Sequence, residues 1–365
     1  MTAAAPAPDR WAEIGEARYP LHLGPGLIDR LGAIWPDGRA GAAALIVSDG
    51  NVPELARRVR AALQQADVRV ITASVPPGEA SKSLGEVERL SRLAAEAGLR
   101  RADTVVALGG GVVGDLAGFV AASYQRGVRL VHVPTTLLAM VDSSVGGKTG
   151  VDLPEGKNYV GAIWQPEMVV MDTDTLATLP ARQLACGFAE VVKYGLLDSP
   201  ALFERVEEWP ALPGEPEALA DLIRRCVDHK LAIVAADERE TGMRASLNLG
   251  HTVGHGIEAA AGYDLYHHGE AISLGLLAAL RLSEEVSGLE PEWRARTEVV
   301  LRRHGLPVRL DRDVRTDAIL EAMGRDKKAE AGALNMVMIG SPGDVRLKVS
   351  PPHDRVVAAI EELRA

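Results

Sequence analysis

The feature that most constrains the fold is the alternation of short β-branched segments with helical periods between residues 19 and 135. Strands are predicted at residues 43–48, 68–72, 104–108 and 129–133. Helical periods near residues 52–66, 83–98 and 112–125 separate them. Because strands that alternate with helices pair in parallel, this half is predicted to be an α/β domain with a parallel sheet covered by helices.

The pattern changes beyond Pro180 to long helical periods over residues 180–197, 217–237 and 270–286, with weak strand signals near 334–339. The second half is therefore expected to be mainly helical. We place the boundary near residue 178, because Thr178 can cap a helix that carries Pro180 in its first turn. Two domains, residues 1–178 and 179–365, also agree with the length of 365 residues.

Composition excludes several classes of protein. Hydrophobic residues make up 47% of the chain and charged residues 25%, as in globular proteins, which argues against disorder. The formal charge of −10 leaves no broad positive field to attract nucleic acid or an anionic membrane. Cys186 and Cys226 form no CxxC pair, and the N-terminus lacks a basic start followed by an apolar run. We therefore expect a cytoplasmic protein that is neither secreted nor inserted in a membrane.

A glycine-rich turn follows the third predicted strand. Residues 109–115 read GGGVVGD and satisfy G-x-G-x-x-G between a strand and a helix, which predicts a dinucleotide with its pyrophosphate at the helix N-terminus. A tight turn without a ligand is the alternative. The acidic residue that usually follows about 20 positions later is missing. Asp49, at the end of the first predicted strand, would bind the ribose hydroxyls or, equally well, cap the next helix.

The segment 144–150, SVGGKTG, has the composition of a phosphate-binding loop. The pattern GxxxxGK[ST] requires glycine where Asp142 stands, so a nucleotide triphosphatase is not expected. Lys148 lies on a glycine-rich segment that we expect to be irregular. We interpret its ammonium group as directed at a compact anion.

Four of the nine histidines fall between residues 251 and 268, and this clustering indicates a site. His251 and His255 are four residues apart and would lie on one helical face, an arrangement common in metal sites. His268 follows a loop and could return to the same point. A solvated or core-bonded histidine pair is the alternative.

The helix predicted after Pro180 offers a carboxylate as third ligand. At 100° per residue, Glu190 and Lys193 lie with Cys186 and Gly187 on the face opposite the large apolar residues. This face is either an exposed salt bridge or one acid and one base in a cleft. Two imidazoles and one carboxylate would leave an open position for substrate, as in catalytic zinc sites.

Several blocks of sequence, taken in order, resemble the 3-dehydroquinate synthases, a family of sugar-phosphate cyclases. The blocks are GGGVVGDLAGFVAASYQRG, VPTTLLAMVDSSVGGKTGVDLPEGKN, GFAEVVKYG, ADERETGMRASLNLGHTVGHGIE, HHGEA and RDKK, and they cover roughly residues 45–330. The resemblance implies an N-terminal Rossmann-like domain that binds NAD and a mainly α-helical C-terminal domain that binds one Zn²⁺ or Co²⁺. It also implies an active site in the cleft between them, and a homodimer.

The resemblance assigns residues to roles. It implies Glu190, His251 and His268 as the metal ligands and makes His255 a residue that either supports the ligands or faces the substrate. The other positions that it implies for catalysis or substrate binding are Lys148, Asn158, Lys193, Lys230, Arg244, Asn248 and Lys327 or Lys328. Arg126 would reach the substrate phosphate, in its own subunit or in the partner. The cofactor positions that it implies are Asp49, Asn51, Glu79, Lys82, Gly110, Gly111, Val112, Val113, Gly114, Asp115, Thr135, Thr136, Asp142, Lys148, Lys157, Thr175, Leu176 and Thr178.

The implied reaction converts 3-deoxy-D-arabino-heptulosonate 7-phosphate to 3-dehydroquinate and phosphate without net redox change. NAD⁺ oxidises C5 of the substrate, phosphate is eliminated, the hydride returns, the ring opens and an intramolecular aldol step closes the carbocycle. Lys148 and Lys193 would stabilise developing oxyanions, and Asn248 and His255 would handle protons.

Three alternatives stay open at this point. Another sugar-phosphate cyclase, such as aminodehydroquinate synthase, would use a related substrate. A metal-dependent polyol dehydrogenase shares the architecture but would release NADH. A non-catalytic NAD-sensing protein would be expected to have lost the metal ligands, all three of which are present.

Overall fold

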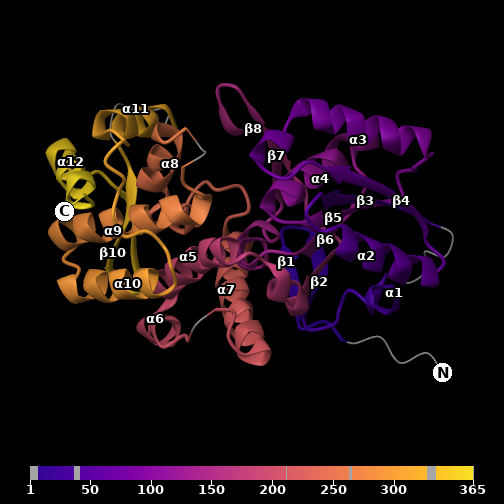
Figure 1. Ribbon diagram of the computed structural model, residues 1–365, viewed down its shortest axis with the longest axis horizontal. Coiled ribbons are helices and arrows are strands. Elements are labelled where there is room, and N and C mark those ends of the chain that lie inside the picture. The colour runs from indigo at the N-terminus through magenta and orange to yellow at the C-terminus, as the bar shows by residue number, and fades with distance from the viewer. Residues whose placement is uncertain (1–6, 37–41, 211, 263–264, 327–333, 365) are drawn as a thin grey trace. The chain divides into compact units, whose positions relative to one another are not determined.

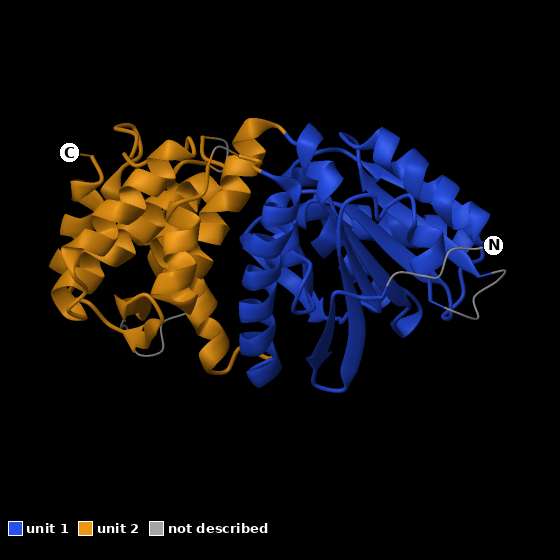
Figure 2. Cartoon of the chain, turned by 90° about the horizontal axis from the view of Figure 1, so that it is seen from below, with its two compact units in different colours: residues 1–179, 215–238 blue, residues 180–214, 239–365 orange. Residues whose placement is uncertain are grey.

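The structure is a computed structural model that describes residues 7–36, 42–210, 212–262, 265–326 and 334–364. The chain divides into two compact units (Figures 1 and 2). Unit 1 comprises residues 1–179 and 215–238, and unit 2 comprises residues 180–214 and 239–365.

Unit 1 is built on a seven-stranded sheet with the strand order β1-β2-β9-β6-β5-β3-β4. Its strands are β1 (Arg10–Ile14), β2 (Ala17–Gly24), β3 (Ala43–Asp49), β4 (Arg69–Val75), β5 (Thr104–Gly109), β6 (Arg129–Pro134) and β9 (Met168–Asp172). Strands β1 and β2 are antiparallel, and the other neighbouring pairs are parallel. The predicted parallel sheet is therefore confirmed, with β3 to β6 as the four predicted strands.

Helices cover both faces of this sheet. The helices of unit 1 are α1 (Leu31–Ile34), α2 (Pro53–Gln65), α3 (Leu84–Glu96), α4 (Gly111–Ser123) and α7 (Pro216–Ala236), with short helices η1 (Glu79–Ser81), η2 (Tyr124–Arg126), η3 (Ala139–Ser143) and η4 (Thr173–Thr178). Along β3, Leu45 and Val47 pack in a core with α3 and α4. Ala44 and Ile46 pack with α1 and α2 on the opposite face. Because successive side chains alternate between faces, both sides of the strand are apolar.

A separate antiparallel hairpin, β7 (Lys148–Leu153) and β8 (Gly156–Ile163), lies beside α4. The approach is close, since a Cβ built on Gly118 of α4 would lie 2.4 Å from Cγ2 of Thr149. Lys148 is therefore the first residue of a strand, and the irregular segment expected for it is wrong.

The division between the units differs from the sequence expectation in one respect. The change at Leu179 and Pro180 lies next to the boundary expected at 178, but residues 215–238 group with unit 1. The reason is packing, because α7 contacts β1, β2, η3 and η4. Thr178 also does not cap the next helix. Its hydroxyl donates to the Thr175 carbonyl at 3.2 Å, and Pro180 is the N-cap of α5 (Ala181–Asp198).

A buried histidine of the sheet predicts a pH-dependent stability. His132 on β6 is 6% exposed, and burial lowers its pKa to about 4. Below pH 6.5 this histidine is protonated in the unfolded chain, whereas in the folded chain it stays neutral until about pH 4. The free energy of unfolding should therefore fall as the pH drops from 6.5 to 4. The gap corresponds to roughly 3 kcal/mol at most. In urea unfolding, His132→Asn should lose less stability than the wild type between pH 7 and pH 5, and equal losses would contradict the prediction.

Unit 2 is mainly helical, as expected. Its helices are α5, α6 (Pro200–Glu207), η5 (Met243–Asn248), α8 (His251–Ala260), α9 (His268–Val286), α10 (Pro291–Arg303), α11 (Thr316–Asp326) and α12 (His353–Glu362). Helix α9 is central and contacts α5, α8, α10 and α12. It also contacts β10 (Met336–Ser341), which pairs with β11 (Asp344–Val349) and corresponds to the weak strand signal. Over the described residues, no helix combines the length and apolarity needed to cross a membrane.

Candidate active site

Three helices of unit 2 bring Glu190, His251 and His268 together. Glu190 lies on α5 and is fully buried, while His251 and His268 are the first residues of α8 and α9. Glu190 Oε1 lies 3.7 Å from His251 Nε2 and 3.6 Å from His268 Nε2. One ligand atom from each residue lies within 4.8 Å of the others. The three side chains therefore form one candidate donor set, which we call the Glu-His-His trio.

Glycines at the helix crossings allow this convergence. A Cβ built on Gly269 of α9 would lie 2.1 Å from the carbonyl oxygen of Cys186 on α5. One built on Gly275 would lie 2.1 Å from the carbonyl oxygen of Gly250, which caps α8. A side chain at Gly269 would push α9 away from α5, and one at Gly275 would push it away from α8, because a packed interior has no space for the added atoms.

The ring nitrogens of the two histidines suit a metal ion. His251 Nδ1 lies 3.2 Å from the Leu249 carbonyl oxygen, and His268 Nδ1 lies 3.3 Å from Glu258 Oε2. With a proton on each Nδ1, the Nε2 lone pairs face Glu190. Two imidazoles and one carboxylate are a ligand set of catalytic Zn²⁺, with a position left for substrate. The residues therefore fit a divalent cation.

Lys193 lies beside the carboxylate, with Nζ 2.5 Å from Glu190 Oε2 and a side chain only 1% exposed. The exposed salt bridge is therefore wrong as an interpretation of this pair. Burial, followed by the charge of Lys193, lowers the pKa of His251 to about 3. Burial also opposes the charge on His268, but hydrogen bonds to Glu190 and Glu258 outweigh it and raise its pKa to about 10. His251 is therefore neutral near pH 7, whereas a cation would have to displace a proton from His268.

His255 lies on the same face of α8 as its helical spacing predicts. Its ring centroid is 5.3 Å from that of His251 and 5.9 Å from that of His268. It forms a second group of possible ligands with Glu258 and His268. Helical spacing alone favoured His255 as the second histidine ligand beside His251. In the structure, the group that contains Glu190 has His268 in that role.

In unit 1, β5 leads through Gly109 and Gly110 into α4, as the glycine motif predicts. Gly110 is the N-cap, and among the described residues no side chain caps the helix. A Cβ on Gly110 would lie 3.2 Å from Thr136 Cγ2, and one on Gly111 would lie 3.2 Å from Ser143 Oγ. Larger residues would be crowded at these two positions, and the first N–H groups of α4 have no acceptor within the helix, which fits the pyrophosphate of a dinucleotide. Val112, Val113 and Gly114 form the rest of this first turn.

Further cofactor candidates lie at the carboxyl ends of neighbouring strands. Asp49 ends β3, which pairs with β5, and its Oδ1 accepts a hydrogen bond from Asn51 N at 2.7 Å. The N-cap of α2 is Val52, so the alternative role of Asp49 as a helix cap is wrong. Thr135 follows β6 and donates its N–H to the Gly109 carbonyl at 2.9 Å. Open α/β sheets bind ligands at this edge.

A buried lysine links several of the predicted cofactor positions. Lys82 Nζ lies 2.8 Å from Asp115 Oδ2, 3.4 Å from Glu79 Oε1 and 4.0 Å from Asp152 Oδ1. Burial disfavours its charge, but the three carboxylates outweigh burial and raise the pKa of Lys82. Burial raises the pKa of Asp115 in spite of this partner. The four side chains form one ion-pair cluster beside the first turn of α4.

Lys230 and Asp142 are also in contact within unit 1. Lys230 Nζ donates to the Asp142 carbonyl oxygen at 2.5 Å and to its carboxylate. This contact joins α7 to η3, which explains part of the packing of α7 on unit 1. Of the remaining cofactor candidates, Thr175, Leu176 and Thr178 lie on η4 and Lys157 on β8.

Two candidate substrate residues adopt left-handed backbone conformations. Asn158 on β8 has φ 59°, and its N–H donates to Asp152 Oδ1 at 2.8 Å. Arg126 has φ 63° and follows Gln125 with φ 50°. Non-glycine residues in this region are costly and often serve a function.

Comparisons with known proteins agree with this geometry. Family models described as "3-dehydroquinate synthase N-terminal" and "3-dehydroquinate synthase C-terminal" match residues 72–186 and 187–329. A 3-dehydroquinate synthase from Symbiobacterium thermophilum is 45% identical over 361 residues, which cover 96% of this chain and 99% of the relative. The chain belongs to the 3-dehydroquinate synthase family.

Solved structures with the same fold include other cyclases. One is 2-deoxy-scyllo-inosose synthase in complex with carbaglucose-6-phosphate, NAD⁺ and Co²⁺, with 26% identity and a TM-score of 0.88 over 97% of this chain and 99% of that one. Another is 2-epi-5-epi-valiolone synthase from Streptomyces hygroscopicus with NAD⁺ and Zn²⁺, with 28% identity and a TM-score of 0.86 over the same shares.

Two further positions that the 3-dehydroquinate synthase family implies, Arg244 and Asn248, lie on η5, directly before α8. Arg244 is 2% exposed, and Asn248 Nδ2 donates to Glu240 Oε1 at 3.0 Å. They precede His251 in the chain by seven and three residues. Lys327 and Lys328 lie outside the described residues.

Sequence reasoning missed Glu258, Gly269 and the partner of Asn248, Glu240. The sequence could have indicated Glu258 as a site residue, because it follows His251 by seven residues and so lies on the same helical face. The close approach at Gly269 depends on α5, which is distant in sequence, so no local signal marks it.

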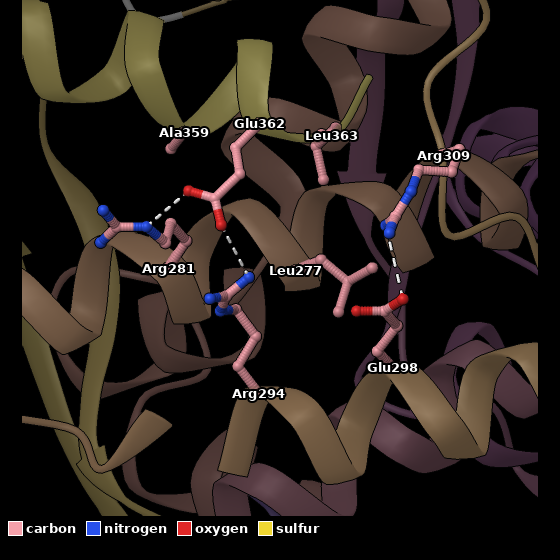
Figure 3. Close-up of a pocket in the computed structure, with 8 residues that line it drawn as sticks. All are labelled: Leu277, Arg281, Arg294, Glu298, Arg309, Ala359, Glu362 and Leu363. Atoms are coloured by element: carbon pink, nitrogen blue, oxygen red, sulfur yellow. Dashed lines mark hydrogen bonds and ion pairs between the residues drawn. The ribbon is translucent and has the colours of Figure 1, made fainter. Parts of the chain in front are cut away.

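A small cavity of about 190 Å³ lies elsewhere in unit 2 (Figure 3). Its arginines already pair with carboxylates, because Arg281 and Arg294 contact Glu362 at 2.7 and 3.0 Å and Arg309 contacts Glu298 at 3.4 Å. The two pairs of Glu362 join α12 to α9 and α10. The cavity is therefore a structural feature of this 3-dehydroquinate synthase homologue, and its charges are compensated.

Proposed function

We propose that this protein is a 3-dehydroquinate synthase. It converts 3-deoxy-D-arabino-heptulosonate 7-phosphate to 3-dehydroquinate and phosphate, with NAD and one Zn²⁺ or Co²⁺ as cofactors. The observation that carries the proposal is the Glu-His-His trio with the buried Lys193, in a chain of this family. The Co²⁺ and Zn²⁺ complexes of the related cyclases support the choice of metal.

In the proposed reaction, NAD⁺ supplies a reversible hydride acceptor, and the cation supplies Lewis-acid polarisation of a substrate hydroxyl. Glu190, His251 and His268 hold the cation. The turn at Gly110 and Gly111 binds the pyrophosphate of NAD. Asp49 binds a ribose hydroxyl.

The chain's own side chains bind the substrate and handle its charge. Lys193 is buried and positively charged, so it stabilises negative charge that develops on a substrate oxygen. Lys148 and Arg126 bind anionic groups of the substrate, and local positive charge of this kind accommodates a doubly anionic sugar acid in a protein with a net charge of −10. Asn248, oriented by Glu240, and His255 hold or move protons on the substrate hydroxyls.

The proposal further includes assembly as a homodimer and a cytoplasmic location. Light scattering of the purified protein tests the homodimer: a mass of twice 38.7 kDa supports it, and a monomer would refute it.

The test of the activity is direct. The zinc- or cobalt-loaded protein is incubated with NAD and the heptulosonate phosphate, while phosphate release, carbocyclic product and NADH are followed. Phosphate and product should appear in equal amounts without accumulation of NADH, because the hydride returns to the substrate. Accumulating NADH with a polyol substrate would instead identify a dehydrogenase. Turnover of the amino analogue alone would identify an aminodehydroquinate synthase.

A further inference from the structure

His268 lies between two buried carboxylates that come from different helices. Its Nε2 is 3.6 Å from Glu190 Oε1 on α5, and its Nδ1 is 3.3 Å from Glu258 Oε2 on α8. Glu190 is fully buried and Glu258 is 3% exposed. The two contacts use both nitrogens of one ring, so together they fix its position and its orientation.

We propose that Glu258 is a positioning residue that orients His268 for the divalent cation. The inference rests on the proposed function in one respect, because it takes the Glu-His-His trio as the metal site. Glu258 accepts the Nδ1 hydrogen and thereby places the Nε2 lone pair toward Glu190. A carboxylate in this place also makes the imidazole a stronger donor.

The two histidines of the trio differ in how they are oriented. His251 Nδ1 meets the neutral carbonyl oxygen of Leu249 at 3.2 Å, whereas His268 Nδ1 meets a carboxylate. His251 is fixed by the residue two positions before it, at the start of its own helix. His268 follows a loop, so its orientation depends on Glu258, which comes from another helix. Glu258 therefore matters more for His268 than any single group does for His251.

A competing assignment makes Glu258 a ligand itself, since His255, Glu258 and His268 offer ligand atoms within 4.8 Å of one another. That set and the Glu-His-His trio share His268. If cations filled both, His268 would have to give up the protons of both ring nitrogens. One cation at the trio, with Glu258 as the hydrogen-bond acceptor, avoids this requirement.

The test compares zinc affinity in three variants, measured by competition with a chromophoric chelator, and records the visible spectrum of the Co²⁺ forms. Glu258→Gln keeps the volume and an acceptor oxygen but loses the charge, so zinc affinity should fall about 10-fold. Glu258→Ala removes the acceptor and should weaken it about 100-fold. The Co²⁺ spectrum should change in both variants.

Glu284→Gln is the matched control. Glu284 lies on α9, its side chain is 11% exposed, and it pairs with Arg294 at 2.6 Å. It is about 24 Å along the helix from His268, at 1.5 Å per residue. This control should keep the wild-type zinc affinity and Co²⁺ spectrum.

Three results would overturn the inference. The first is unchanged zinc affinity in both Glu258 variants, with folding verified by circular dichroism. The second is a fall from two zinc ions per chain to one with the remaining affinity unchanged, which would make Glu258 a ligand. The third is an equal loss in Glu284→Gln, which would indicate general disruption of α9. Failure of the proposed function looks different, since wild-type protein would then bind zinc yet release no phosphate from the heptulosonate phosphate.

Discussion

Replacing Glu190 by alanine is expected to abolish turnover while NAD binding is kept. Glu190 Oε1 faces both imidazoles of the Glu-His-His trio, so its removal takes away the only carboxylate of that set. The Lewis acid contributes several kcal/mol to transition-state stabilisation, which corresponds to a loss of roughly 1,000-fold or more in kcat/KM. The NAD candidates lie in unit 1, whereas Glu190 lies in unit 2. Steady-state kinetics, zinc content and calorimetric NAD titration measure the three quantities.

The alanine variant has a second effect that must be separated from the first. It leaves the buried Lys193 without the carboxylate that it contacts at 2.5 Å, and breaking a buried ion pair costs about 3–5 kcal/mol of stability. Glu190→Gln keeps the volume and has a milder packing effect, but it should still lose most of the zinc affinity. A folded Glu190→Gln protein with wild-type zinc content and turnover would remove Glu190 from the site.

Replacing Gly269 by alanine is expected to have the second largest effect on activity, although glycine has no side chain that could take part in the reaction. The added methyl group would collide with the Cys186 backbone, so α9 must move and carry His268 away from Glu190. Displacements of about 1 Å cost on the order of 100-fold in activity. Overpacking also destabilises by about 1–3 kcal/mol. Kinetics, zinc affinity and urea unfolding should therefore all change.

Gly324→Ala provides the matched control for this substitution. Gly324 also lies on a helix of unit 2, α11, and a Cβ built there meets no atom within 4 Å among the described residues. Alanine should raise the stability of that helix by up to about 1 kcal/mol. If Gly269→Ala behaved like Gly324→Ala, the close approach of α9 and α5 would have no part in the site.

Burial on both faces explains only part of which strands the sequence could predict, because β4 was predicted although it has exposed residues at several positions, and β9 was missed although all of its residues are buried. Strands β3 and β5 are continuous apolar runs, because each is covered by helices on both sides. Strands β1 and β2 carry a more mixed pattern, with exposed residues at several positions, and were missed. The hairpin β7–β8 was missed as well, because its glycines indicate irregular backbone, while its pairing depends on contact with α4.

The site was predictable to the extent that its chemistry is local. The spacing of His251 and His255 correctly placed both on one face, and the glycine motif indicated the turn before α4. Helical periodicity showed Glu190 and Lys193 on one side of α5, but not which histidine would meet them. That choice depends on tertiary packing at Gly269 and Gly275, which no single segment encodes.

The insertion of α7 into unit 1 has a consequence for biosynthesis. The chain leaves unit 1 at residue 179, returns at 215 and leaves again at 239. A ribosome therefore has to deliver α5 and α6, which belong to the other unit, before the helix that packs on β1 and β2 emerges. Unit 1 cannot complete its fold before the nascent chain passes residue 238. A gene fragment that stops at residue 179 would accordingly yield a polypeptide in which β1 and β2 lack the helix that packs on them, and which is prone to aggregate.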